Sequence, residues 1–142
     1  MISDSKANFD INFLDHVAIL VKDTEASALW YQKVLGLRIV KAAKWEPFPI
    51  FLLAGKTGIA LFPANLDDPK FDSNARNVKI DHYAFNVSNE NFKKALEHYS
   101  ELGLDHKVKD HHYFHSVYIK DLDGHTVELT TLVVDESEFY SE

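Results

Sequence analysis

The sequence predicts an α+β fold made of two copies of one module, each a strand followed by a helix and three further strands. The first observation is a repeated strand, because residues 14–21 read Leu-Asp-His-Val-Ala-Ile-Leu-Val and residues 80–87 read Ile-Asp-His-Tyr-Ala-Phe-Asn-Val. The second is that a helix-like segment ending in Leu-Gly-Leu follows each copy. The third is that three strand-like segments follow each helix. At 142 residues, the two modules form one domain.

Both helix-like segments have capping residues and an apolar stripe. Asp23 or Thr24 is expected to cap the first helix, and Ser88 or Asn89 the second. The glycine of each Leu-Gly-Leu is placed to end its helix. The residues expected to face the core at helical spacing are Ala26, Leu29, Trp30 and Val34 in the first helix, and Phe92, Leu96, Tyr99 and Leu102 in the second.

The remaining strands complete the two modules in order. They are expected at about 37–42, 49–53, 58–62, 105–109, 113–120 and 124–132. Module one therefore covers about 13–62 and module two about 80–132. Residues 63–79, rich in Pro, Asp and Asn, are interpreted as a linker, and residues 133–142 as a solvated acidic tail.

The last two predicted strands form a hairpin whose register can be derived. Their Asp-Leu-Asp-Gly connection is typical of a tight turn. A hairpin centred on Asp123 places Tyr118 opposite Glu128 and Ser116 opposite Thr130. Cross-strand partners share a face, so these four polar side chains point one way and the alternating apolar residues point toward the helices. A carboxylate in the middle of such a strand requires a partner.

The chain has a formal net charge of −7, no cysteine and no cluster of lysine and arginine residues. A protein that binds nucleic acid or an anionic membrane surface needs a basic face, so neither partner is expected. The lack of cysteine excludes disulfides, thiolate nucleophiles and thiolate metal ligands. No apolar leader is present near the start, and no apolar run reaches the ~20 residues of a membrane span. These features favour a cytoplasmic protein.

The repeat places His16 and His82 in the same slot of two equivalent strands. Together with Glu128 they supply two imidazoles and one carboxylate, which can bind one side of a divalent metal and leave the other side open for substrate. Such a site favours Fe²⁺ or Mn²⁺, and Zn²⁺ or Ni²⁺ is possible. A single histidine is more often a core residue, and a single strand glutamate is more often solvated or paired with lysine. The duplication favours the metal site.

Two further groups of residues have open interpretations. Trp45 and Phe48 can form an apolar wall over the metal that suits an aromatic substrate, although core or dimer packing explains them equally well. His111 and His112 stand in a stretch rich in histidine and aromatic residues. They are interpreted either as the lip of a pocket or as a partly exposed strand edge.

The chain resembles the glyoxalase/bleomycin-resistance/extradiol-dioxygenase superfamily, also called vicinal oxygen chelate proteins. The resemblance rests on Leu-Asp-His at 14–16, the two Leu-Gly-Leu segments, Ile-Asp-His-Tyr-Ala-Phe at 80–85 and the segment 118–128. It implies paired βαβββ modules that form a cupped mixed sheet around a divalent metal, with the same two histidines and Glu128 as ligands. It also implies a small-molecule substrate and a homodimer.

Within this superfamily the resemblance is closest to the three-ligand enzymes. Glyoxalase-type isomerases usually take another ligand from the last strand of module one, where residues 58–62 have no suitable side chain. The segment from His111 through Tyr118 to Glu128 is similar to ring-cleaving dioxygenases, which implies action on a catechol or vicinal diol. In that reading Tyr118 hydrogen-bonds the substrate oxygen, and His111 or His112 stabilises bound oxygen or moves protons.

Three alternatives remain open. A fosfomycin-type thiol transferase shares Ser116, as a substrate-binding residue, and Tyr118, but has a threonine where this chain has Ala18 and a phosphonate-binding arginine where it has Ser137. A glyoxalase-type isomerase or an epimerase would use the same metal scaffold. A metal-free binder of a small ligand, of the bleomycin-resistance kind, would not need to retain three ligands.

Overall fold

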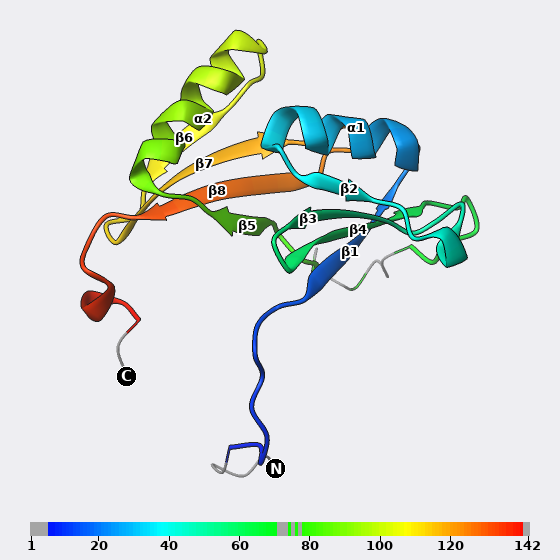
Figure 1. Cartoon of the computed structure of the whole chain (residues 1–142), viewed down its shortest axis with the longest axis horizontal. Coiled ribbons are helices and arrows are strands. Elements are labelled where there is room, and N and C mark those ends of the chain that lie inside the picture. The colour runs from blue at the N-terminus through cyan, green and yellow to red at the C-terminus, as the bar shows by residue number, and fades with distance from the viewer. Residues whose placement is uncertain (1–5, 71–73, 75, 77, 141–142) are drawn as a thin grey trace.

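The computed structural model describes residues 6–70, 74, 76 and 78–140 and contains the two expected βαβββ modules (Figure 1). Module one consists of β1 (His16–Val21), α1 (Thr24–Leu35), β2 (Arg38–Val40), the short 3₁₀ helix η1 (Ala43–Trp45), β3 (Ile50–Ala54) and β4 (Thr57–Pro63). Module two consists of β5 (Tyr83–Asn86), α2 (Asn89–Glu101), β6 (Lys107–Asp110), β7 (Phe114–Lys120) and β8 (Thr126–Leu132), followed by the 3₁₀ helix η2 (Glu136–Glu138).

Each module has its own four-stranded mixed sheet. The strand orders are β1-β4-β3-β2 and β5-β8-β7-β6, with β1 parallel to β4 and β5 parallel to β8. This topology confirms the paired modules, while the sheets remain separate ladders in the described part of one chain. The two helices lie on one side of the sheets, and both chain ends lie on the other side (Figure 1). None of the described helices has the length and apolarity needed to cross a membrane.

The helix boundaries follow from the capping residues predicted from the sequence. Asp23 Oδ1 accepts a hydrogen bond from the N–H of Ala26 at 3.0 Å, and Ser88 Oγ accepts one from the N–H of Asn91 at 3.1 Å. The chain leaves α1 through Gly36, whose φ is +68°, a left-handed conformation that glycine adopts without strain.

The predicted core face of α1 is wrong at Leu29 and omits Ser27 and Tyr31, whereas that of α2 is confirmed. The buried residues of α1 are Ser27, Ala28, Tyr31 and Val34, and Leu29 is 60% exposed. Ser27 and Tyr31 lie on this face because they also make polar contacts with module two. Ser27 Oγ lies 3.4 Å from Asp123 Oδ2, and the Tyr31 hydroxyl donates to Asp121 Oδ2 at 2.6 Å. A pattern of apolar residues could not indicate this face.

Tyr31 is the centre of a polar network that joins the modules. It is fully buried, and its hydroxyl is hydrogen-bonded to the Tyr83 hydroxyl as well as to Asp121. Burial is the main reason that the pKa values of both tyrosines are raised. Nearby, His125 Nε2 donates to the carbonyl of Leu20 at 2.8 Å. The contact between the modules therefore depends on hydrogen bonds as much as on apolar packing.

This network predicts a loss of stability at high pH. The folded-state pKa of Tyr31 lies above the unfolded value of about 10, so stability is complete below that pH and declines as pH rises. Tyr31→Phe is expected to reduce the slope of unfolding free energy against pH by about 1.4 kcal/mol per pH unit above about pH 10. Urea unfolding across this range measures the slope. Tyr140→Phe, which removes an exposed hydroxyl, is the control, and an unchanged slope in Tyr31→Phe would contradict the interpretation.

Gly58 in β4 is required by the close approach of β3. A Cβ atom at this position would lie 2.0 Å from the carbonyl oxygen of Leu52. We expect Gly58→Ala to lower the free energy of unfolding by about 2 kcal/mol, because the backbone of β3 must move. Gly55→Ala is the control, since its Cβ would meet nothing within 4 Å and only its φ of +64° is unfavourable, at about 1 kcal/mol. Equal losses in denaturant titrations of the two variants would refute the steric explanation.

Residues 135–140 of the predicted tail are exposed, and their aromatic rings contact the start of β7. The Phe139 ring packs on Phe114 with centroids 4.8 Å apart, and on Tyr113 at 5.7 Å. The acidic residues of this segment therefore accompany aromatic residues that anchor it to β7. Residues 141–142 of the tail, and 71–73, 75 and 77 of the predicted linker, lie outside the described residues.

Candidate metal centre

The two repeated histidines have the same local geometry. His16 Nδ1 lies 2.8 Å from Asp15 Oδ2, and His82 Nδ1 lies 2.7 Å from Asp81 Oδ2. The hydrogen bond from His82 is the main reason that the pKa of Asp81 is lowered. A carboxylate on one ring nitrogen orients the imidazole and leaves the other nitrogen to face a metal, as is typical of metal-binding histidines.

His82 and Glu128 are brought together as a pair. Glu128 lies on β8 beside β5 and is only 7% exposed, and its Oε1 atom is 2.8 Å from His82 Nε2. The buried carboxylate thus lies within hydrogen-bond distance of this imidazole and beside the Tyr118 hydroxyl. Imidazole nitrogen and carboxylate oxygen are donors that suit divalent iron, manganese, nickel and zinc, so the residues present fit such an ion.

His16 does not join this pair within one chain. Its ring packs against Phe51 with centroids 5.0 Å apart. Among the described residues of a single chain, no group of three His, Cys, Asp or Glu side chains is close enough to hold a metal. The structure therefore brings together two of the three predicted ligands, His82 and Glu128.

Module one lacks a counterpart of Glu128. In module two, Ala84 of β5 pairs with Glu128, and in module one the equivalent residue Ala18 pairs with Ala60. Phe51 stands opposite Ala60 in β3, just as Tyr118 stands opposite Glu128 in β7. Each histidine thus has an aromatic neighbour, and only one module provides a carboxylate.

The predicted register of the final hairpin is confirmed. Tyr118 pairs with Glu128 and Ser116 with Thr130, while Val117, Ile119, Val127 and Leu129 are buried on the other face. The Tyr118 ring meets the His82 ring edge-on at 5.6 Å. Burial and the adjacent Glu128 charge raise the pKa of Tyr118. Its hydroxyl oxygen lies 2.8 Å from His111 Nε2, so His111, Tyr118 and His82 form a continuous row.

Two other predicted residues on module two lie outside this row. Ser116 is fully buried, and its Oγ is 2.9 Å from Thr130 Oγ1. His112 occupies the turn between β6 and β7 with φ of +71°, and its backbone N–H donates to Asp110. Ser116 therefore lies on the same face as Tyr118 and Glu128, and His112 lies in the turn before β7.

The predicted apolar wall lies on module one. The Trp45 ring is 5.3 Å from Phe51, which in turn contacts His16. Phe48 is 6.3 Å from Phe62. The structure thus joins Trp45 to His16 through Phe51, in a row that matches the Tyr118 side of module two.

A lysine-rich cavity of about 470 Å³ adjoins His82 and Tyr118. Its lining includes Lys107, Lys109 and Lys120, together with Asp81 and Asp105. Lys109 Nζ lies 5.9 Å from the centroid of the Tyr118 ring. Sequence reasoning missed these lysines because it considered only arginine as a source of fixed positive charge. Their signal was the alternation of lysines along β6, which places two of them on one face.

Comparisons with known proteins match most of the chain. A family model described as Glyoxalase/Bleomycin resistance protein/Dioxygenase superfamily matches residues 13–129. The chain is 26% identical over 138 residues to Metallothiol transferase FosB of Staphylococcus epidermidis, covering 92% of this chain and 90% of that protein. It is also 26% identical over 116 residues to Glutathione transferase FosA of Serratia marcescens, covering 82% of this chain and 78% of that protein.

Solved structures show the same architecture. The fosfomycin resistance protein FosX from Mesorhizobium loti superimposes with a TM-score of 0.62 at 25% sequence identity, covering 93% of this chain and 100% of that one. The coverage of both chains shows that the similarity extends over the two modules.

Proposed function

The chain belongs to the glyoxalase/bleomycin resistance protein/dioxygenase superfamily, and we propose that it is a divalent-metal-dependent enzyme that transfers a thiol to a small anionic electrophile. The observation that carries the proposal is the pair of His82 and Glu128 beside a cavity lined by three lysines. Relatives named as a metallothiol transferase and a glutathione transferase support the thiol as co-substrate. This favours the thiol-transferase alternative over the ring-cleaving activity expected from the sequence.

The proposed ligands are His82 and Glu128 of one chain and His16 of the partner subunit in a homodimer. Each histidine is oriented by a neighbouring aspartate, as is typical of metal-binding histidines. Among the described residues of its own chain, however, His16 does not belong to any group of three possible ligands. Exposed apolar side chains surround both strands, including Leu14 at 69%, Leu20 at 48% and Ile80 at 73%. A two-fold dimer would cover such surface and create two equal sites.

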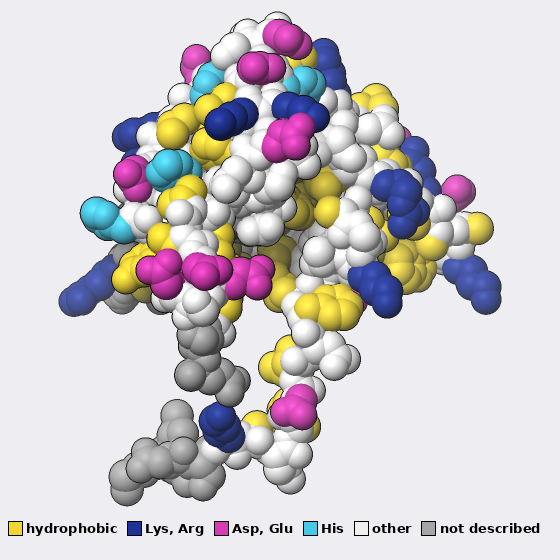
Figure 2. Space-filling model, turned by 60° about the vertical axis from the view of Figure 1, so that its left-hand side comes forward, with side chains coloured by type: hydrophobic (Ala, Val, Ile, Leu, Met, Phe, Trp, Pro, Cys, Tyr) yellow, Lys and Arg dark blue, Asp and Glu magenta, His cyan; other side chains and the backbone are white. Residues whose placement is uncertain are grey.

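The N-terminal segment supports the dimer. It extends away from the body of the molecule, and hydrophobic side chains are visible along it (Figures 1 and 2). Phe9, Ile11 and Phe13 are 68%, 80% and 51% exposed and alternate with polar residues, a pattern typical of an extended segment with one covered face. A second copy of the chain would provide the cover.

A divalent ion held there would act as a Lewis acid on an oxygen of the electrophile. Side chains of the protein would bind the substrate and transfer the protons. Lys107 and Lys109 attract the anionic group, and Tyr118 holds the reacting oxygen. The thiol gives up its proton to solvent, and its sulfur attacks carbon as the carbon–oxygen bond breaks. The released oxygen takes the Tyr118 proton, and His111 passes a replacement proton from solvent to Tyr118 across their hydrogen bond.

The assay uses fosfomycin, a phosphonate epoxide, with glutathione or cysteine as the thiol. Protein loaded with Mn²⁺, Ni²⁺ or Zn²⁺ is expected to form an adduct that mass spectrometry detects, and chelator-treated protein is not. Lys109→Met is expected to raise KM about tenfold through loss of one charged contact, and Lys93→Met, outside the cavity, serves as its control. No adduct with any of these metals would overturn the assignment of substrate and thiol.

Complementation tests the shared site separately from the reaction. His16→Ala and His82→Ala chains each lose every site when alone. Co-expressed, half of the dimers are mixed and hold one intact site of two, so about a quarter of the parental bound metal should return. No recovery in isolated mixed dimers would show that the ligands belong to a single chain.

Ring cleavage remains a second candidate because His111 and Tyr118 are hydrogen-bonded at 2.8 Å, as that chemistry requires of an acid–base pair. Fe²⁺-loaded protein would then consume oxygen with catechol and form a yellow product. An oxygen electrode distinguishes this activity from thiol transfer, which uses no oxygen.

A further inference from the structure

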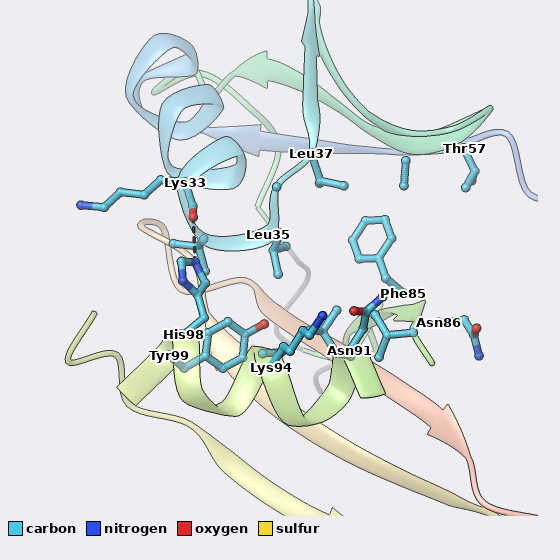
Figure 3. A pocket seen from close by; sticks show the side chains of 16 residues that line it. Lys33, Leu35, Leu37, Thr57, Phe85, Asn86, Asn91, Lys94, His98 and Tyr99 are labelled. Carbon is cyan, nitrogen blue, oxygen red and sulfur yellow. Dashed lines mark hydrogen bonds between the residues drawn. The ribbon is translucent and has the colours of Figure 1, made fainter. Parts of the chain in front are cut away.

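A second cavity, remote from the metal centre, lies between the modules on the helix side. Its volume is about 690 Å³, which is within the usual range for small-molecule sites. The end of α1, the start of β2, β5 and α2 contribute to its walls (Figure 3). None of His16, His82, Glu128 or Tyr118 lines it.

Most of the wall is apolar. Leu35 and Leu37 come from module one, and Phe85, Val87 and Ala95 come from module two. Figure 3 shows Leu35, Leu37 and Phe85 facing one another across the space. The apolar part of a ligand would thus contact both modules at once.

The cavity also contains an unsatisfied hydroxyl. Tyr99 of α2 is 1% exposed, and its hydroxyl has no hydrogen-bond partner among the described residues. Figure 3 shows this hydroxyl turned toward the space below Leu35. Burial raises the pKa of Tyr99, so the group remains a proton donor at ordinary pH. A buried donor without an acceptor is unfavourable, and a ligand oxygen would supply one.

The polar part of the lining favours an anion. Asn91 and Lys94 precede Tyr99 on α2, and Figure 3 shows their side chains directed to the same space. Lys94 also pairs with Glu90 at 3.3 Å, but both side chains are exposed and such a pair is weak. No Asp or Glu residue lines this cavity among the described residues. Amide, ammonium and hydroxyl donors together match a carboxylate.

A hydrogen bond between the two helices borders the cavity. His98 Nε2 donates to the carbonyl of Lys33 at 2.9 Å, which links α2 to the last turn of α1. The cavity is therefore bounded on one side by a direct link between the modules.

We propose that this cavity binds a small amphipathic carboxylate. Its hydrocarbon body lies between Leu35 and Phe85, and its carboxylate accepts a hydrogen bond from Tyr99 and is neutralised by Lys94. The proposal is independent of the metal centre, because none of the proposed metal ligands takes part.

Titration of chelator-treated protein with octanoate, followed by ligand-observed NMR, tests the class of ligand. Octanol and octylamine have the same chain without the negative charge, and each is expected to bind at least about tenfold more weakly. Absence of octanoate binding, or equal binding of the three, would overturn the proposal.

Variants locate the bound molecule. Ala95→Trp fills the cavity and should abolish binding, and Lys94→Met should weaken it about tenfold, whereas Lys93→Met should not. Tyr99→Phe should also weaken binding about tenfold while raising the Tm of the ligand-free protein, because it removes the unsatisfied hydroxyl. Unchanged binding in Ala95→Trp, or a lower Tm in Tyr99→Phe, would contradict the assignment.

Discussion

Glu128→Gln is expected to reduce metal affinity by more than about a hundredfold and to abolish thiol transfer, because removal of a ligand exceeds the 10–100-fold effect of losing an outer partner. The change keeps the shape of the side chain and removes the buried negative charge beside His82. Titration of chelator-treated protein with Mn²⁺ or Zn²⁺, in competition with a chelating dye, measures the affinity.

The matched variants separate a ligand from a supporting residue. Asp81→Asn weakens only the orientation of His82, so we expect metal affinity to fall by about 10–100-fold. Glu90→Gln removes an exposed carboxylate of α2 and should leave the affinity unchanged. If Glu128→Gln kept the parental metal affinity, Glu128 would not be a ligand, and the proposed metal centre would be contradicted.

Asp121→Ala is expected to lower the free energy of unfolding by about 4 kcal/mol, which is unusually large for one substitution. The Asp121 carboxylate accepts from the Tyr31 hydroxyl at 2.6 Å and from the backbone N–H groups of Asp123 and His125 at 2.9 Å each. The two backbone donors would lose this acceptor, and the Tyr31 hydroxyl would keep only Tyr83 as a partner in the contact between the modules.

Urea unfolding at neutral pH measures this loss. Asp105→Ala is the control, because it removes an exposed aspartate of the same module. Asp121→Asn should lose less than the alanine variant, since it retains an oxygen acceptor. Similar stability of the Asp121 and Asp105 alanine variants would show that the network contributes little to the association of the modules.

The sequence was sufficient for the features that local patterns specify. The repeated strand and Leu-Gly-Leu segments predicted both modules, and Asp23 and Ser88 predicted the helix starts. The turn before β8 placed Tyr118 opposite Glu128, because a tight turn fixes the register of a hairpin.

Features that depend on the contact between modules could not be predicted in the same way. Tyr31 and Ser27 have buried polar partners because Asp121 and Asp123, about a hundred residues away, come next to them in the fold. In the proposed dimer, His82 of one chain would meet His16 of the other, and no periodicity within one chain encodes such a pairing. The cavity at Tyr99 likewise exists only after α1 and α2 are placed together.

The pairing of Ala18 with Ala60, where the other half has Glu128, affects the electrostatics of the whole centre. Two equivalent halves would surround a doubly charged cation with two carboxylates and cancel its charge. In the proposed centre, a single carboxylate ligand would leave one unit of the ion's positive charge within its ligand set, offset in part by Asp15 and Asp81. Together with the three lysines of the adjoining cavity, such a field would attract negatively charged molecules before any contact forms, so the missing acid in one half would act as an electrostatic filter.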